Sequence, residues 1–347
     1  MTCEQAEETP QFLTPAALRA RLEAWLSHAG PALAVGLSGG PDSMALCRVL
    51  SDLYMEGNFP EIHAITVDHG LRPESAVEAV QVGKWVAGWP GVTHVILTRT
   101  PPEGGTKLME NARFDRYRLL EEYCAKHGIF LLLTAHHRDD QAETLLFRLA
   151  KGSGLDGLAA MRPVRRLSSG LQLCRPLLDT SKAALIETCK TYGVPFIDDP
   201  SNHNEAYARP RMRVLLEGLK AEGLTTDLLV RTVSRLSRAR EALDFYTDKA
   251  EQDACLKKET GRIVFEYLPF QSLPEEISLR LLQRACRHVR GEEQALSGYG
   301  PRMNRLEELA GMLKSGDPVR TTMAGCLFTV NRKNNTLTVE QENGSSP

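Results

Sequence analysis

Short apolar runs alternate with longer amphipathic stretches along the first two hundred residues of the chain. The runs have the length of buried strands, and the stretches between them repeat apolar residues at helical spacing. The expected strands are residues 33–37, 62–68, 94–98, 129–134, 171–173 and 194–198. The expected helices are residues 14–29, 44–55, 75–87, 107–127, 139–150 and 181–192. This order predicts an α/β fold, an open and mostly parallel sheet with helices on both faces.

The alternation of strands and helices stops near Pro200. The spacing then predicts mostly helix over residues 211–290, a loop over 291–301 and a helix over 305–314. Residues 319–339 alternate like a β-hairpin that turns at Asn334 and Asn335. We therefore expect one α/β domain over residues 1–215. A smaller, mainly helical domain over residues 216–347 would end in this hairpin.

Composition places the chain among ordinary globular proteins, with 42% hydrophobic and 25% charged residues. No apolar run reaches the roughly 18 residues of a membrane helix, so we expect no membrane partner. The acidic, polar N-terminus lacks the features of a signal peptide. The eight cysteines include no C-x-x-C pair, which argues against a zinc ribbon or a dithiol redox motif. These features predict a soluble, cytoplasmic protein with reduced thiols.

Basic residues are bunched, although the 42 Lys and Arg nearly balance the 44 Asp and Glu. One group lies between residues 201 and 240, and a second follows helical spacing between residues 280 and 290. Such patches on a neutral chain favour a polyanionic partner. A solvated helix surface is the alternative. The two groups are Arg209, Arg211, Arg213, Lys220, Arg231, Arg235, Arg238 and Arg240, then Arg280, Arg284, Arg287 and Arg290.

The hexapeptide SGGPDS, residues 38–43, stands between a predicted strand and a predicted helix. Its two glycines allow a ligand to approach the backbone, and its hydroxyl and N–H groups form an anion-binding nest at a helix start. The expected ligand is a phosphate or pyrophosphate. No lysine lies inside the turn, so it is not a kinase-type P-loop. Asp42 suits such a ligand if Mg²⁺ bridges the two. The alternative is a turn that binds nothing.

A second motif, AHHRDDQAET, occupies residues 135–144 at the carboxyl end of an expected strand, the sheet edge where ligands bind. His136, Asp140 and Glu143 follow i, i+4 and i+7 spacing, so we expect them on one helix face. Such a face could hold a metal ion, or its carboxylates could receive an ammonium group. A solvated acidic helix start is the alternative.

A third motif, ENARFDRY at residues 110–117, carries Arg113 and Arg116 at i, i+3 spacing. Two guanidinium groups so placed can bind phosphate or carboxylate, although arginines on a helix often form a solvated face. The glycine-rich segment 152–158 is predicted to be either part of the site or a flexible connector. DPSN, residues 199–202, precedes the first basic group.

The hexapeptide resembles the loop of the PP-loop ATP pyrophosphatases, whose fold is of the adenine nucleotide alpha hydrolase type. The motifs together, with RPLL at residues 175–178, resemble the tRNA(Ile)-lysidine synthase family over about residues 30–215. The resemblance implies a carbon–nitrogen ligase that cleaves ATP to AMP and diphosphate. ATP would adenylate carbon 2 of cytidine 34 in the CAU anticodon of a minor tRNA(Ile), and L-lysine would displace AMP. The resulting lysidine changes decoding from AUG to AUA.

The resemblance also implies roles for individual residues, with ATP and Mg²⁺ at the hexapeptide. Asp140 and Glu143 would bind lysine, and Asp42 would bind the metal. The family has Asn where this chain has Pro210, so the contact of that Asn is in doubt. A homodimer is left open. The residues implied in ATP binding are Ser38, Gly39, Gly40, Pro41, Asp42 and Ser43. The residues implied in catalysis are Asp42, Arg113, His136, Asp140 and Glu143. The C-terminal domain would bind tRNA, and the arginines implied in tRNA binding are Arg116, Arg209, Arg211, Arg213, Arg231 and Arg235.

Other classes of protein remain alternatives. A PP-loop tRNA thiolase generally needs a cysteine pair or an iron–sulfur cluster, and C-x-x-C is missing here. A small-molecule amidotransferase-type synthetase does not account for the basic C-terminal helices. A non-catalytic RNA-binding module would not be expected to keep Asp42, His136, Asp140 and Glu143 together.

Overall fold

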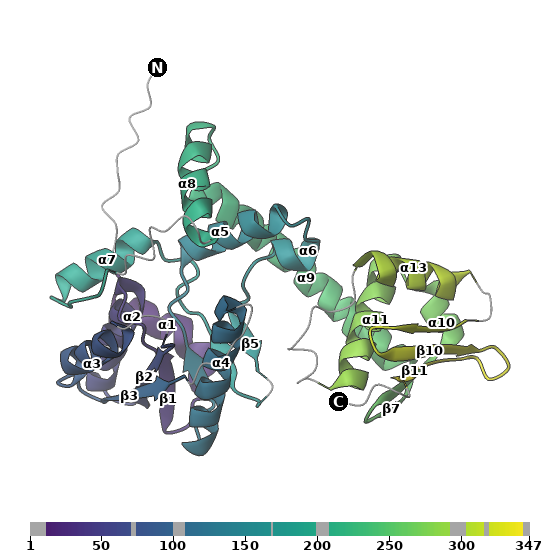
Figure 1. Ribbon diagram of the computed structural model, residues 1–347, viewed down its shortest axis with the longest axis horizontal. Helices are drawn as coiled ribbons and strands as arrows, with labels where there is room; N and C mark the ends of the chain where they lie inside the picture. The colour runs from purple at the N-terminus through teal and green to yellow at the C-terminus, as the bar shows by residue number, and fades with distance from the viewer. Residues whose placement is uncertain are drawn as a thin grey trace. The chain divides into compact units, whose positions relative to one another are not determined.

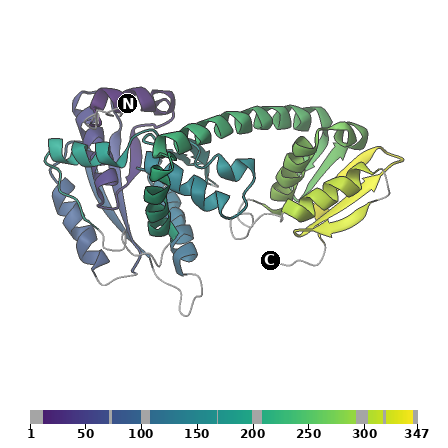
Figure 2. The same cartoon turned by 90° about the horizontal axis from the view of Figure 1, so that it is seen from above.

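The computed structural model describes residues 12–70, 74–99, 108–167, 169–198, 208–291, 303–315 and 319–342, without the side chains of 108–113 and 208–210. The chain divides into two compact units, Met1–Ser237 and Arg238–Pro347. The division lies inside helix α9 (Thr226–Ala254), beyond the boundary expected at residue 215. Figures 1 and 2 show the elements of each unit.

The first unit is built on a six-stranded sheet in the order β3-β2-β1-β4-β6-β5. All neighbouring strands are parallel except β5 and β6, which confirms the expected open, mostly parallel sheet. The edge strand β5 was not expected from the sequence. The strands are β1 (Ala32–Gly36), β2 (Glu61–Asp68), β3 (Val92–Thr98), β4 (Leu131–Leu133), β5 (Val164–Arg166) and β6 (Gln172–Cys174).

Helices cover both faces of this sheet because its central strands are apolar on both sides (Figure 1). Leu33 and Val35 pack with α1, α2, α3 and α7 on one face, while Ala34 between them packs with α4 on the other. The helices are α1 (Pro15–Leu26), α2 (Pro41–Met55), α3 (Ser75–Val86), α4 (Leu108–Lys126), α5 (Arg138–Leu149), α6 (Leu155–Leu158) and α7 (Lys182–Thr191).

The segment 194–198 does not extend the sheet, so that expectation was wrong. Its backbone instead pairs with the turn after β1, where the Ile197 N–H donates to the Gly39 carbonyl at 2.9 Å. The pattern of apolar residues in this segment reflects packing against that turn, not a place in the sheet.

Helix α8 (Ala208–Ala221) and the first part of α9 pack against α5. Leu145 and Leu146 of α5 share an apolar cluster with Leu216 of α8 and with Leu229 and Val233 of α9. This cluster explains why the first unit continues past residue 215.

The second unit contains a five-stranded antiparallel sheet in the order β7-β8-β11-β10-β9. The expected hairpin is present, and Asn335 turns between β10 and β11 with φ of 52°. Helix was expected over residues 255–266, and that was wrong. Ile263 and Phe265 are buried on alternate positions of a strand, and Gly261 forms the turn before it with φ of 71°. The strands are β7 (Cys255–Glu259), β8 (Arg262–Glu266), β9 (Arg320–Met323), β10 (Cys326–Asn331) and β11 (Thr336–Gln341).

The described part of the second unit also contains the end of α9 and the helices α10 (Tyr267–Ser272), α11 (Glu275–Arg290) and α13 (Met303–Lys314). Phe265, Phe270 and Phe328 are fully buried between these helices and the sheet. Within the described ranges of either unit, no helix is long and apolar enough to cross a membrane.

Candidate active site

The SGGPDS loop, residues 38–43, connects the carboxyl end of β1 to the start of α2. Ser43 Oγ accepts from the Ser38 N–H at 3.1 Å and donates to the Gly40 carbonyl at 3.1 Å, and Ser38 Oγ lies 3.1 Å from Ser43 Oγ. Pro41 is the first residue of α2, where its missing N–H costs nothing. The positive end of α2 therefore lies at the loop and favours an anion.

Gly39 holds the loop in a shape that would be strained with any side chain at this position. Its φ is 84°, a conformation that side chains disfavour. A Cβ atom at this position would lie 2.6 Å from Val82 Cγ2 and 2.9 Å from Ile197 Cδ1. The loop thus packs tightly on α3 and on segment 194–198.

Two side chains that no sequence motif marked support the loop from behind. Thr66 Oγ1 donates to the Leu37 carbonyl at 2.7 Å, so the same oxygen accepts from His94 Nε2 at 2.9 Å. Burial lowers the pKa of His94, which favours the neutral ring. Only the pairing of β2 with β3 brings Thr66 and His94 together, so no local pattern could have found them.

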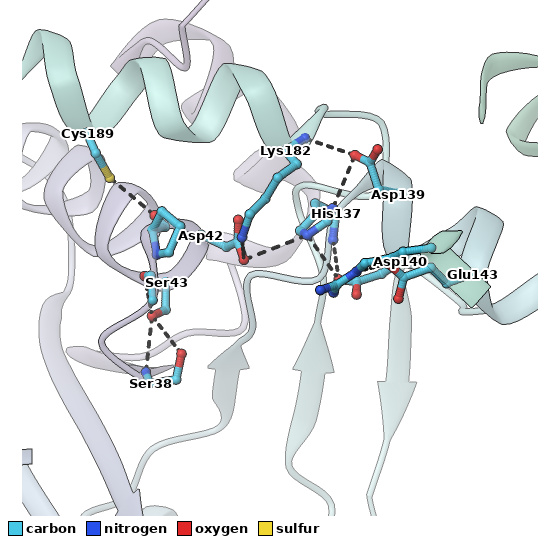
Figure 3. Close-up of polar contacts among 12 residues, drawn as sticks. Ser38, Asp42, Ser43, His137, Asp139, Asp140, Glu143, Lys182 and Cys189 are labelled. Atoms are coloured by element: carbon cyan, nitrogen blue, oxygen red, sulfur yellow. Dashed lines mark hydrogen bonds and ion pairs between the residues drawn. The ribbon is translucent and has the colours of Figure 1, made fainter. Parts of the chain in front are cut away.

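Asp42 forms an ion pair with a lysine that lies far away in the sequence (Figure 3). Its Oδ2 atom is 2.7 Å from Nζ of Lys182, the first residue of α7. Its Oδ1 atom is buried and has no hydrogen-bond partner among the residues that the structure describes. Such an oxygen fits a divalent cation, the metal that the sequence led us to expect at Asp42.

His137 lies at the centre of three carboxylates. Its Nε2 atom is 3.7 Å from Asp42 Oδ2 and 3.6 Å from Asp140 Oδ2, and its Nδ1 atom is 3.4 Å from Asp139 Oδ2. Burial opposes the charged ring, but these carboxylates outweigh burial and raise the pKa of His137. The site therefore favours a proton on this ring.

Asp139 connects the starts of α5 and α7. Its Oδ2 atom accepts from the Lys182 backbone N–H at 2.9 Å and faces His137. Burial raises its pKa, yet the close His137 ring and the hydrogen bond from the Lys182 backbone N–H prevail and bring the pKa to about 2. The carboxylate is charged and fixes where α7 begins.

His136 lies outside α5, which begins at Arg138 with His137 as its N-cap. We expected His136, Asp140 and Glu143 on one helix face, but only Asp140 and Glu143 belong to the helix. His136 Nδ1 lies 2.9 Å from Thr134 Oγ1. The structure thus brings His137 to the carboxylates, and the catalytic role of His136 stays a prediction.

Asp140 and Glu143 are 7% and 3% exposed on the inner side of α5. Asp140 Oδ2 accepts from the His137 backbone N–H at 3.1 Å. Glu143 Oε1 accepts from Arg213 Nε of α8 at 2.6 Å, which joins the second motif to the basic segment. Burial lowers the pKa of Arg213, but Glu143 outweighs burial and raises it. A cation already fits against Glu143.

The structure describes the side chains of some of the other predicted basic residues and not of others. The Arg116 guanidinium lies over the Tyr117 ring, 5.1 Å from its centre. Arg211, Arg231 and Arg235 are exposed on α8 and α9. The side chains of Arg113 and Arg209 lie outside the described residues.

The second basic group, on α11, is largely engaged within the protein. Arg280 Nη1 is 2.9 Å from Asp244 Oδ1, and Arg284 Nη1 is 3.3 Å from Glu251 Oε2. The two acidic residues belong to α9. Arg280 is buried. These two arginines join helices of the second unit, and binding of a polyanion by the group as a whole stays a prediction.

The glycine-rich segment 152–158 and the residues after it are hydrogen-bonded to α5. Gln141 Nε2 donates to the Met161 carbonyl at 3.1 Å, and its Oε1 accepts from the Met161 N–H at 2.8 Å. Arg148 Nη1 donates to the Gly157 carbonyl at 2.8 Å. The RPLL segment is also fixed, since Leu177 pairs with His137 in a parallel bridge.

Comparisons with known proteins agree with this geometry. The family ATP_bind_3, described as a PP-loop domain, matches residues 14–218. The tRNA(Ile)-lysidine synthase of Bradyrhizobium sp. (strain BTAi1) is 41% identical over 86% of this chain and 87% of its own. That of Methylobacterium nodulans is 41% identical over 89% and 90%. The U34-tRNA thiolase NcsA of Methanococcus maripaludis, solved with its [4Fe-4S] cluster, is 16% identical with a TM-score of 0.53 over 64% of this chain and 76% of its own, a likeness of fold.

Proposed function

Because the chain belongs to the tRNA(Ile)-lysidine synthase family of PP-loop proteins, we propose that it joins L-lysine to carbon 2 of cytidine 34 in a tRNA(Ile) with a CAU anticodon. The cytidine O2 atom attacks the α-phosphate of ATP and diphosphate leaves. The lysine ε-amine then attacks carbon 2, AMP leaves, and lysidine remains. The observation that carries this proposal is the 41% identity to curated lysidine synthases over 86% and 89% of this chain. The reaction takes place in the cytoplasm.

The SGGPDS loop holds the phosphates of ATP in this proposal. Its hydroxyl groups and the start of α2 provide donors and positive potential for the diphosphate that leaves. Asp42 would hold the Mg²⁺ that neutralises charge on the phosphates, and its buried, unpartnered Oδ1 atom supports this role.

Asp140 and Glu143 bind the amino acid in this proposal. Both carboxylates are buried, so an ammonium group beside them is attracted more strongly than in water. The Arg213 guanidinium already pairs with Glu143, which supports a cation at this position. The ε-amine must lose a proton before it attacks, and a carboxylate at this place can accept that proton.

The anticodon stem approaches the basic segment in this proposal. Arg211, Arg231 and Arg235 are exposed on α8 and α9, and Arg116 lies on α4. Their charges suit RNA phosphates. Arg113 and Arg209 belong to the same proposed surface through the family resemblance.

A tRNA thiolase is not favoured as the second candidate. Burial raises the pKa of Cys47, Cys124 and Cys174 to about 12, so these thiols stay protonated and unreactive. The only specific observation for a thiolase is the fold shared with the archaeal enzyme.

The experiment is to incubate the protein with ATP, labelled lysine and a tRNA(Ile) transcript carrying a CAU anticodon. We expect labelled lysidine at position 34, with AMP and diphosphate as the other products. A transcript with a GAU anticodon is the control and should remain unlabelled. Formation of ADP, or incorporation of sulfide or ammonia in place of lysine, would refute the proposal.

A further inference from the structure

The SGGPDS loop contains no lysine, yet the folded chain supplies one to it. Lys182 follows Asp42 by 140 positions, and its Nζ atom lies 2.7 Å from Asp42 Oδ2. The two side chains are 39% and 23% exposed, so both reach the open side of the site. Lys182 belongs to none of the sequence motifs that suggested the site.

The backbone of Lys182 is held firmly at this place. Its N–H donates to Asp139 Oδ2, and the preceding Ser181 caps α7 by accepting from the Ala184 N–H at 3.1 Å. Further along α7, Cys189 Sγ donates to the Pro41 carbonyl of the loop at 3.3 Å. The start of α7 is therefore held by Asp139 and its far part by the loop, while the four-carbon stem of Lys182 can still swing.

Lys182 is held on Asp42 less strongly when a metal nucleotide arrives. A divalent cation on Asp42 Oδ1 would offset the charge of the carboxylate, so its Oδ2 atom would attract the ammonium group less and Lys182 could turn to another anion. When it leaves Asp42, that ammonium group still lies beside the loop and the positive start of α2 (Figure 3). The strongest acceptor that enters there is a phosphate of ATP.

We propose that Lys182 is a phosphate-binding residue of this site, paired with Asp42 in the free protein and transferred to the diphosphate part of ATP when the metal nucleotide binds. This inference rests on the proposed function, since it presupposes that ATP binds at the SGGPDS loop. Lys182 thereby does from a distant helix what a lysine inside the turn does in kinase-type loops.

The test is the affinity of Lys182→Gln for ATP and for inorganic pyrophosphate at saturating Mg²⁺. We expect both affinities to fall by about tenfold or more, the value of a charged hydrogen bond. Lys182→Arg should retain most of the affinity, because a guanidinium also binds phosphate. Lys190→Gln, an exposed lysine of the same helix, is the matched control and should bind like the wild type.

The direction in which Lys182→Gln changes the ATP affinity distinguishes a phosphate-binding residue from a residue that only pairs with Asp42. If Lys182 only competes with the metal, its removal frees Asp42, and ATP binds equally or more tightly; that outcome overturns the inference. Equal reductions in Lys182→Gln and Lys182→Arg, with a lowered melting temperature, would indicate a structural role and also overturn it. If the wild-type protein binds no ATP, the proposed function itself fails, whereas normal wild-type binding with an unaffected Lys182→Gln refutes only the role of Lys182.

Discussion

The two oxygens of Asp42 have different surroundings, and this determines what its substitution should do. Oδ2 pairs with Lys182 and Oδ1 is buried without a partner. Asp42→Asn removes the charge that a metal needs, so we expect diphosphate release with tRNA and ATP to fall by about 100-fold or more. The ion pair is partly exposed, so the free energy of unfolding should change by less than about 1 kcal/mol.

Diphosphate release and urea unfolding of the same preparation check both parts of this prediction. Asp52→Asn, on the same helix and paired with Arg48, is the control and should retain wild-type activity. An Asp42→Asn protein that is stable and fully active would contradict a role in ATP chemistry.

The buried pair of carboxylates on α5 carries the second prediction. Asp140→Asn or Glu143→Gln removes one negative charge beside the proposed ammonium group, so the KM for lysine should rise by about tenfold or more. Adenylation does not need lysine, so adenylated tRNA should accumulate in both variants. Diphosphate release with and without lysine, together with labelled-lysine incorporation, measures the two steps.

Glu187→Gln, an exposed carboxylate of α7, is the control for these variants. Wild-type dependence on lysine in both Asp140→Asn and Glu143→Gln would remove the lysine-binding role from this pair.

Among the elements, the turn between β1 and α2 depends on Gly39 in two separable ways. Gly39→Ala must adopt a positive φ and also places a Cβ against Val82 and Ile197. Gly57→Ala has the same conformational demand, with φ of 87°, but nothing lies within 4 Å of its Cβ. We expect Gly57→Ala to cost about 1 kcal/mol of unfolding free energy and Gly39→Ala about 1–3 kcal/mol more.

Urea unfolding of the two variants and their ATP affinities check this prediction. Only Gly39→Ala should weaken ATP binding, because it shifts the loop. Equal stability of the two variants would mean that the close approaches at Gly39 are relieved without cost.

The pairing of β2 with β3 makes the stability of the first unit depend on pH through His94. Burial lowers the pKa of His94 in the folded state. As pH falls below about 6.5, the unfolded chain takes up a proton that the folded ring resists, so the free energy of unfolding falls. The contribution of His94 is present above that pH and disappears below it.

Denaturant unfolding at pH 7 and pH 5 measures this dependence. His94→Asn should be less stable than the wild type at pH 7, since it loses the bond to Thr66, and should lose less stability on acidification. An unchanged pH dependence in the variant would exclude His94 as its source.

For the whole molecule, the prediction concerns tRNA. Arg231 and Arg235 are exposed on α9, whereas Arg280 and Arg284 are paired with acidic residues. The double change of Arg231 and Arg235 to Glu should weaken tRNA binding. It should also reduce the log–log salt slope by about 0.7–0.9 for each phosphate that is no longer neutralised. ATP affinity should not change.

Filter binding at several salt concentrations checks this prediction, with Lys190→Glu as the exposed control on α7. A salt slope equal to that of the wild type would indicate that these arginines form a solvated helix surface.

Prediction from sequence succeeded where the determining interactions are local. Thr14 and Pro15 mark the start of α1, and the Thr14 hydroxyl does accept from the Ala17 N–H. It failed over residues 194–198 and 255–266, where apolar residues are compatible with several local structures. Packing against Gly39 in one case, and pairing with β11 in the other, selected the conformation.

The sequence by itself determined the parallel sheet, the SGGPDS loop at the carboxyl end of β1 and the acidic start of α5. Each follows from periodicity, glycine placement or helix capping within a few residues. Only the tertiary structure decided that Lys182 meets Asp42, that Arg213 meets Glu143, and that His137 lies between the carboxylates. These interactions join segments far apart in the chain, and the crossovers of the sheet bring them to one edge. Local sequence patterns cannot predict these contacts, because the contacts form only when the helices pack on a common core.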